Sequence, residues 1–148
     1  MTPDLPTTRV PNGLECGALL EPTGEGGLTV TGRFPHEVVA GEQTVAGTVE
    51  VAAGRQEVRG VVTPQADVFL VRDGRIVTLP VPQDAVGMRV DLADGRVERM
   101  PATATLAPCS GARALERGSY QLYVRVVLNH DDGSETDSTG GPWPLEVR

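Results

Sequence analysis

The sequence predicts an all-β protein, an immunoglobulin-like Greek-key antiparallel β-sandwich of about eight or nine strands. The 148-residue chain is rich in valine and holds 18 glycines and 12 prolines, which favours short strands joined by turns. Asp-Gly pairs at Asp73-Gly74, Asp94-Gly95 and Asp132-Gly133 follow apolar runs. Because such pairs supply the positive φ angles of tight turns, we expect hairpins there.

The strongest strand signal runs from Tyr120 to Leu128, where every second residue is apolar. Successive side chains of a strand point to opposite faces, so one face, including Leu122, should lie in the core. The run is introduced by Leu-x-x-Gly-x-Tyr, ending at Tyr120, which resembles the tyrosine corner of Greek-key sandwiches. We therefore expect the Tyr120 hydroxyl to bond to backbone a few residues upstream.

The remaining elements follow from alternation and turn residues. Residues 1–13, rich in Thr and Pro, are expected to form a flexible leader or linker ahead of a single domain at 14–148. The segments with strand patterning are, in order, Leu14–Leu20, Leu28–Phe34, Gln43–Ala53, Gln56–Thr63, Ala66–Arg72, Arg75–Leu79, Met88–Leu92, Val97–Met100, Ala102–Cys109, Tyr120–Leu128 and a final edge strand, Pro142–Val147.

Two cysteines, Cys16 and Cys109, allow two interpretations. A disulfide between them would close a long loop and stabilise the fold by about 4–5 kcal/mol in the chain-entropy model. Two buried free thiols in a cytosolic protein would need no further explanation. Their wide separation argues against a metal site or a Cys-x-x-Cys redox pair.

Charge limits the possible partners. All 13 basic residues are arginine, which excludes a Schiff-base or phosphate-loop lysine, and the net charge is −7. An acidic protein is a poor fit to nucleic acid or to an anionic membrane surface. No apolar run approaches the ~20 residues of a membrane span, so no membrane insertion is expected. The first residues also lack the pattern of a signal peptide, which was either removed or never present.

No constellation for catalysis is evident, and we expect no enzyme, catalytic residue, metal or cofactor. The only histidines are His36 and His130, and no Gly-x-Ser-x-Gly elbow is present. His130 precedes an acidic run, Asp131-Asp132-Gly133-Ser134-Glu135, which could hold a cation or form a polar hairpin turn. Its spacing does not match an EF-hand loop, which favours the turn.

Three features could serve binding to another protein. In the loop Leu79–Gly87, prolines on both sides of Val81 stiffen an extended conformation, which lowers the entropy cost of docking. The candidate residues of this loop are Val81, Pro82, Gln83 and Asp84. Trp143, the only tryptophan, could anchor a partner or close one end of the core. A free strand edge could accept a partner's strand, but the sequence does not locate one.

Four segments together carry a resemblance to uncharacterised secreted or lipid-anchored Ig-like proteins of high-GC Gram-positive bacteria. They are the Gly-x-Tyr strand entry, Phe69–Arg75, Pro82–Gly87 and Gly140–Leu145. The resemblance implies an exported domain with paired cysteines and no catalytic residues. The Gly-x-Tyr strand alone is similar to the intracellular proteinase inhibitors of bacilli.

These observations lead to one functional hypothesis and two alternatives. We expect a non-catalytic, extracytoplasmic protein-interaction domain at the bacterial cell surface. A protease inhibitor acting through residues 79–87, or a structural subunit of an assembly, would be the alternatives. Reduced cysteines would instead indicate a cytoplasmic protein.

Overall fold

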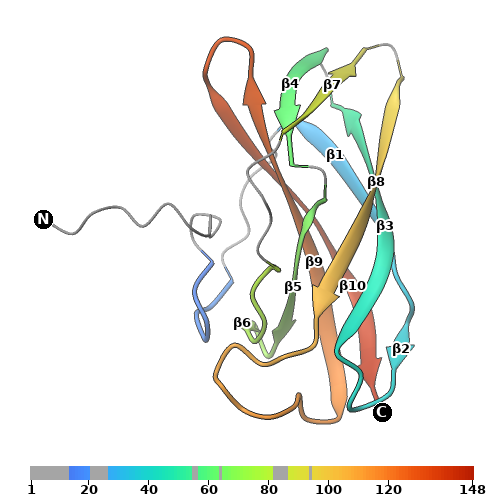
Figure 1. Cartoon of the computed structure of the whole chain (residues 1–148), viewed down its shortest axis with the longest axis vertical. Coiled ribbons are helices and arrows are strands. Elements are labelled where there is room, and N and C mark those ends of the chain that lie inside the picture. The colour runs from blue at the N-terminus through green and yellow to red at the C-terminus, as the bar shows by residue number, and fades with distance from the viewer. Residues whose placement is uncertain (1–13, 21–26, 55–56, 64, 82–86, 94) are drawn as a thin grey trace, which may run out of the picture.

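The structure is a computed structural model and describes residues 14–20, 27–54, 57–63, 65–81, 87–93 and 95–148. These residues form an all-β sandwich of ten strands without a helix (Figure 1). The strands are β1 (Leu28–Arg33), β2 (Glu37–Val38), β3 (Thr44–Ala53), β4 (Val58–Val62), β5 (Asp67–Arg72), β6 (Arg75–Ile76), β7 (Met88–Leu92), β8 (Val97–Thr105), β9 (Gly118–His130) and β10 (Glu135–Val147).

Two sheets face each other across the core. The smaller has the order β1-β3-β8, and the larger has the order β2-β10-β9-β4-β7. Along one side β9 pairs with β10, whereas its other side pairs first with β5 and then, at Asn129 and His130, with β4. The short strand β6 extends the sheet beyond β5.

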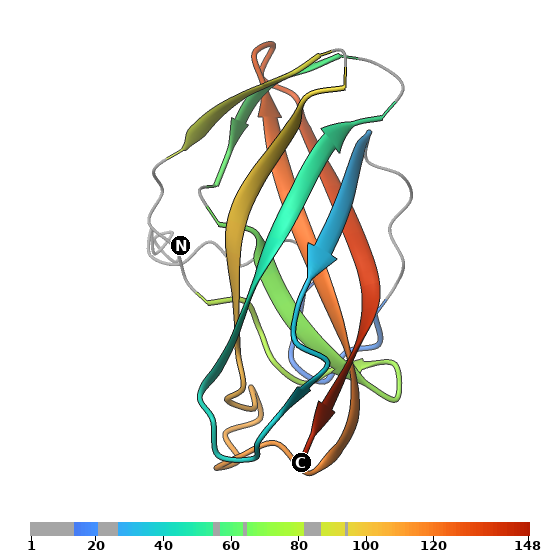
Figure 2. The same ribbon diagram turned by 90° about the vertical axis from the view of Figure 1, so that its right-hand side faces the viewer.

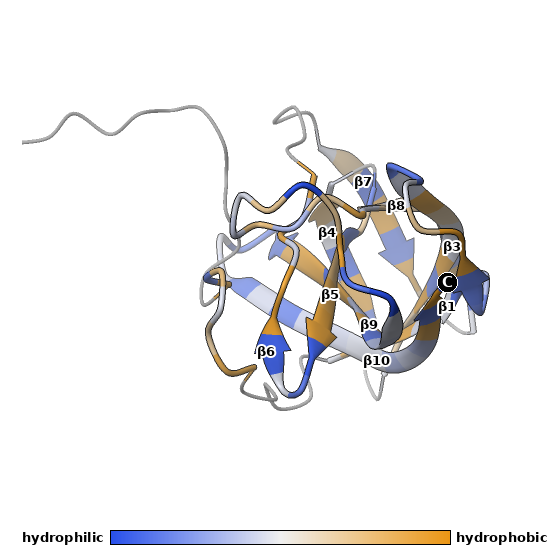
Figure 3. Ribbon diagram, turned by 90° about the horizontal axis from the view of Figure 1, so that it is seen from below, coloured by the Kyte–Doolittle hydropathy of each residue, from blue (hydrophilic) through white to orange (hydrophobic). Residues whose placement is uncertain are grey.

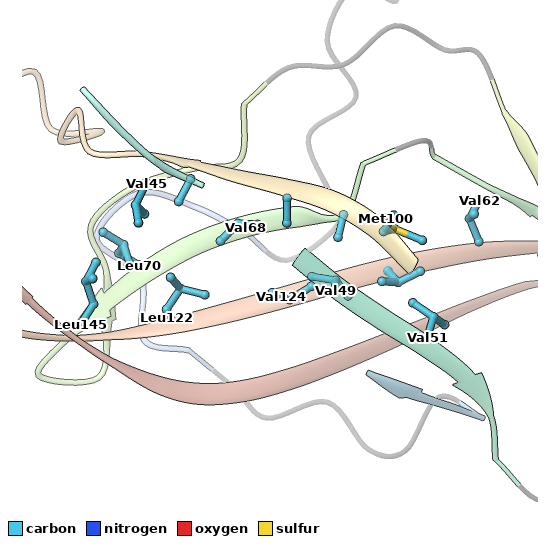
Figure 4. Packing of buried hydrophobic residues seen from close by; sticks show 14 of the residues in the cluster. Val45, Val49, Val51, Val62, Val68, Leu70, Met100, Leu122, Val124 and Leu145 are labelled. Carbon is cyan, nitrogen blue, oxygen red and sulfur yellow. The ribbon is translucent and has the colours of Figure 1, made fainter. Parts of the chain in front are cut away.

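The core between the sheets is built from valine and leucine, as the scarcity of aromatic residues requires. Side chains of β3 and β8 meet those of β5, β9 and β10 (Figure 4). The fully buried residues include Val49, Val124 and Leu122. Burying each such side chain contributes roughly 1.5–3 kcal/mol, so the alternating pattern of these strands accounts for most of the sandwich's cohesion.

A second, smaller cluster lies on the outer face of β5. Phe69, Val71 and Ile76 are buried there beneath Leu14, and the ring of Tyr123 stacks on Phe69 at 5.8 Å between centroids. This cluster explains why β5 is apolar on both faces, in contrast to the other strands.

The chain changes sheet between β1 and β2. Strand β1 pairs antiparallel with β3 and ends at Arg33, opposite Thr48. The chain then crosses to the larger sheet, where β2 pairs in parallel with the last two residues of β10 (Figure 2). The first residues of β3, from Thr44 onward, therefore extend beyond the end of β1.

The predicted fold class is confirmed, and most strands lie where alternation placed them. The hairpin at Asp73-Gly74 has φ angles of 52° and 78°, the two positive values of a type I′ turn. A hairpin also joins β9 to β10 around Gly133. Two departures are small: β6 ends at Ile76 rather than Leu79, and residues 97–109, predicted as two strands, form one strand that ends at Thr105.

Three predictions were wrong. Residues 14–20 turn at Gly17 (φ 80°) and make only an isolated bridge, from Leu19 to Arg75, instead of a strand. Asp94-Gly95 joins no hairpin, because β7 pairs with β4 and β8 pairs with β3 in the opposite sheet. The segment 142–147 is no edge strand but the end of β10, between β9 and β2. Residues 1–13 lie outside the described residues.

Candidate binding surface

One end of the sandwich carries two hollows that share a wall. We call this region the end surface; Figure 3 looks onto it, with the C-terminus toward the viewer. The larger hollow has a volume of about 570 Å³ and the smaller about 300 Å³. Both are lined by Val39, Glu42 and Thr44, from the β2–β3 connection and the start of β3. These shared residues form the ridge between the hollows.

Val39 is the most exposed large apolar side chain of the described residues, at 63%. Its neighbour Val38, the last residue of β2, points into the core and is 7% exposed, because successive side chains of an extended chain face opposite sides. A turn closed by the Glu42 amide donating to the Val39 carbonyl at 3.1 Å follows directly. The sheet change thus places an apolar side chain in solvent between two hollows.

The larger hollow combines an apolar floor with a mixed rim. Leu106 and Val147 are buried at 6% and 4% exposure, and Leu115 is half-buried. Val81, exposed at 41%, contributes a second apolar side chain to the rim. Two of the four exposed large hydrophobics of the described residues therefore belong to this one hollow.

Charges at the end surface are only partly neutralised. Arg148 forms an ion pair with Glu37 at 2.9 Å beside the smaller hollow. Glu42 and Arg113, both exposed, form no ion pair with any residue that the structure describes. One anionic and one cationic side chain are thus open to a ligand.

The predicted binding residues separate in the structure. Val81 reaches the larger hollow, whereas Pro82, Gln83 and Asp84 lie outside the described residues. Trp143 lines a different hollow of about 480 Å³ with Phe34 and His36. Since these two hollows share no lining residue, Val81 and Trp143 do not form one site.

Trp143 closes an edge of the core. It is half-buried, packs against the main cluster, and lies 6.1 Å from the Phe34 ring between centroids. A Cβ added to Gly32 or Gly140 would fall within 3.0 Å of the indole ring. Both glycines are therefore needed to seat the ring against β1 and β10, which supports a packing role for Trp143.

The structural residues occupy the positions that the sequence suggested. The Tyr120 hydroxyl donates to the carbonyl oxygen of Glu116, which is the hydrogen bond of a tyrosine corner. Arg72 adds a contact that the sequence did not indicate: its Nη1 donates to the same hydroxyl at 3.0 Å, and its guanidinium lies over the ring. Leu122 is fully buried.

The two cysteines form a disulfide, with Cα atoms 5.8 Å apart. The bond fastens residues 14–20 against β6. Backbone bonds from Gly17 to Ile76 and from Leu20 to Gly74 hold the same segment. Cys16 is exposed and Cys109 half-buried, so the bond lies near solvent. The described residues include no helix that could span a membrane.

The acidic run after His130 forms a hairpin turn. Asp131 accepts two hydrogen bonds from Arg89, at 3.0 and 2.7 Å, and these bonds lower the pKa of the carboxyl and raise that of Arg89. Hydrogen bonds from Ser134 lower the pKa of Asp132. No group of three metal-ligating side chains exists among the described residues. The turn interpretation therefore fits this hairpin.

Neither histidine ring is hydrogen-bonded to a serine hydroxyl in the described part of the chain. His130 pairs with Thr136 at 2.6 Å, and His36 lies beside Trp143. The sequence did not single out Val39, Glu42 or Arg113. Apart from Val81, which the sequence did single out, the local signal for this surface was the apolar run Val38–Ala40 ahead of Gly41.

No protein-family model matches the chain, and no curated protein is similar to it. The C-terminal domain of wzt matches with a TM-score of 0.51 and 14% identity, covering 85% of this chain and 76% of that one. A mutant β-glucosidase from Listeria innocua in complex with laminaribiose matches at 0.41 and 14%, covering 82% of this chain and 16% of that one. Spo0M, a sporulation control protein from Bacillus subtilis, matches at 0.40 and 19%, covering 83% of this chain and half of that one. At 14% identity the first of these matches bears on the fold alone, which is a β-sandwich like that of this chain.

Proposed function

We propose that this chain is a non-catalytic, extracytoplasmic domain that binds another protein through the end surface, at the bacterial cell surface. The observation that carries the proposal is Val39, an apolar side chain exposed at 63% between two hollows. Binding energy at protein interfaces concentrates in a few residues at the centre of a well-packed patch. A ridge flanked by hollows offers such a centre, because a partner can enclose it from both sides.

The composition of the end surface supports a protein as the ligand. Apolar side chains at the centre and charged ones at the rim are the usual arrangement of a protein interface. Here Val39 supplies the centre above the apolar floor that includes Leu106, Val81 adds an apolar side chain to the rim, and Glu42 and Arg113 add charges of both signs around them. Opposite charges on the partner would fix its orientation more than its affinity.

The disulfide supports a location outside the cytoplasm. Glutathione and thioredoxin keep exposed thiols reduced in the cytosol, whereas disulfides persist in secreted and surface proteins. Because Cys16 is exposed, a cytosolic reductant would reach the bond. An oxidising compartment is therefore the natural setting for this domain.

The proposal is tested by affinity capture from a cell-envelope extract of the protein's own host, with quantitative mass spectrometry. Val39→Glu places a charge on the ridge, and Val97→Glu is the matched control, since Val97 is 53% exposed on β8 and lines neither hollow. We expect a partner retained by the wild type and the control but lost with Val39→Glu. Capture of the same proteins by both variants, or of none by the wild type, would overturn the proposal.

A further inference from the structure

The sheet change at the end of β1 leaves a strand edge open. Strand β3 pairs with β8 along its whole length, from Thr44 opposite Thr105 to Ala52 opposite Val97. Its other side pairs with β1 only from Thr48 to Ala53, because β1 ends at Arg33. The Phe34 ring then covers Gly47. Residues 44–46 consequently have a strand on one side alone.

The backbone groups at this edge point away from β8. Alternate residues of a strand direct both their N–H and C=O groups to the same side. The Gln43 carbonyl accepts from the Leu106 amide, so Gln43 and Val45 face β8, whereas Thr44 and Ala46 face the open side. No hydrogen bond among the described residues engages the N–H or C=O of Thr44 or Ala46. Two donors and two acceptors are available in strand spacing.

The two outer strands of the same sheet carry protected positions on their free edges. On β8, Pro101 occupies a position that faces outward and has no N–H to offer, and Ala102 bridges to Ala66, the residue before β5. On β1, the Leu28 amide donates to the Ser138 hydroxyl at 3.3 Å. Proteins commonly protect strand edges with proline or by covering them. The edge at 44–46 carries only the small side chains of Thr44 and Ala46 toward solvent.

We propose that an extended segment of the partner protein adds to this edge as a strand, in the place that β1 vacates. The inference rests on the proposed function, because the edge lines the smaller hollow of the end surface. In the added strand, the partner residue opposite Val45 would direct its side chain into that hollow. It would lie against Val38 and Val45, which are 7% and 3% exposed. When a peptide binds by adding a strand to a sheet, its main-chain hydrogen bonds supply affinity and the pockets for its side chains supply specificity.

The surroundings define the chemistry of the segment. An apolar side chain fits the hollow of about 300 Å³ between β2 and β3. A basic residue fits beside Glu42, which has no cationic partner among the described residues. Residues 44–46 themselves line the smaller hollow, so an extended terminus or loop of the partner can contact the edge and the hollow together.

The test uses a displayed library of random nonapeptides selected on the immobilised full-length chain, followed by titration of the best peptide. Ala46→Pro and Thr44→Pro each remove one outward N–H, and Ala46→Ser is the matched control that keeps it. Thermal melts verify folding of each variant. We expect each proline to weaken binding by about tenfold, the value of one backbone hydrogen bond, and the serine to leave it unchanged.

Amide exchange on the ¹⁵N-labelled protein gives a second readout. Saturating peptide should slow exchange at Thr44 and Ala46 but not at Val45, whose amide already faces β8. Peptides that bind normally to both proline variants, or that protect other amides, would overturn strand addition. If Val39→Glu abolishes such binding all the same, side-chain docking at the end surface stands. If selection yields no peptide dependent on either Val39 or residues 44–46, both proposals fail.

Discussion

The Tyr120 hydroxyl lies 2.5 Å from the carbonyl oxygen of Glu116, four residues upstream, and fixes the loop that enters β9. Tyr120 is 3% exposed and the bond is partly buried, so loss of the hydroxyl would leave the Glu116 carbonyl without its donor. Replacement by Phe should lower the free energy of unfolding by about 1–3 kcal/mol, because Arg72 would also lose its acceptor. Urea denaturation measures the change.

Tyr123→Phe is the control for that substitution. Tyr123 lies on the opposite face of β9, is half-buried, and its hydroxyl has no hydrogen bond with the described residues. We expect its removal to change stability by less than about 0.5 kcal/mol. Equal effects of the two substitutions would show that the corner bond contributes nothing.

Leu122→Ala should destabilise the fold by roughly 2–5 kcal/mol. Leu122 is completely buried between the sheets, so truncation removes apolar contacts and leaves a cavity. Val97→Ala serves as the comparison, since Val97 is 53% exposed and should lose little. A Leu122 variant as stable as the Val97 variant would contradict the assignment of this face to the core.

Removal of the disulfide by Cys16→Ser should lower stability by about 4–5 kcal/mol in the chain-entropy model, for a loop of 93 residues. Whether the disulfide is present is checked directly by a thiol count on the unfolded wild-type protein, prepared from its host without reductant. No thiols are expected. Two thiols would indicate a reduced protein and remove the main support for an extracytoplasmic location.

Trp143→Ala should reduce stability but leave partner capture intact at saturating protein. The indole packs on the main cluster beside Phe34 and lines neither hollow of the end surface. Because Trp143 is only half-buried, the expected loss in the free energy of unfolding is smaller than the roughly 3–5 kcal/mol typical of a fully buried tryptophan. If capture fails while the melting temperature is unchanged, Trp143 is a partner anchor instead.

The Asp131 carboxyl should titrate below the usual range, because hydrogen bonds from Arg89 favour its charged form. A lowered folded-state pKa means that this contact stabilises the protein above the unfolded pKa and is lost as pH falls through the folded one. In Arg89→Gln the pKa of Asp131 should rise toward its ordinary value, as measured by carbonyl NMR. Arg99→Gln, whose arginine pairs with Glu50, should leave it unchanged.

Local sequence predicted strands better than it predicted their partners. Asp73-Gly74 and Asp94-Gly95 look alike, yet only the first joins two paired strands. A dipeptide sets the φ angles of a turn, but the sheet that the next strand joins depends on contacts far along the chain. The end surface, apart from Val81, was missed for the same reason. Val39 and the open edge of β3 arise only because β1 ends and β2 pairs with β10.

The disulfide also determines how the domain would carry tension. A pull on the residues before Cys16 passes through the covalent bond to Cys109 and bypasses the chain between them, which includes β1 to β8. With the bond intact, only β9, β10 and the loop before them can be drawn out. Formation of the disulfide therefore limits the length to which the protein can be drawn out under load.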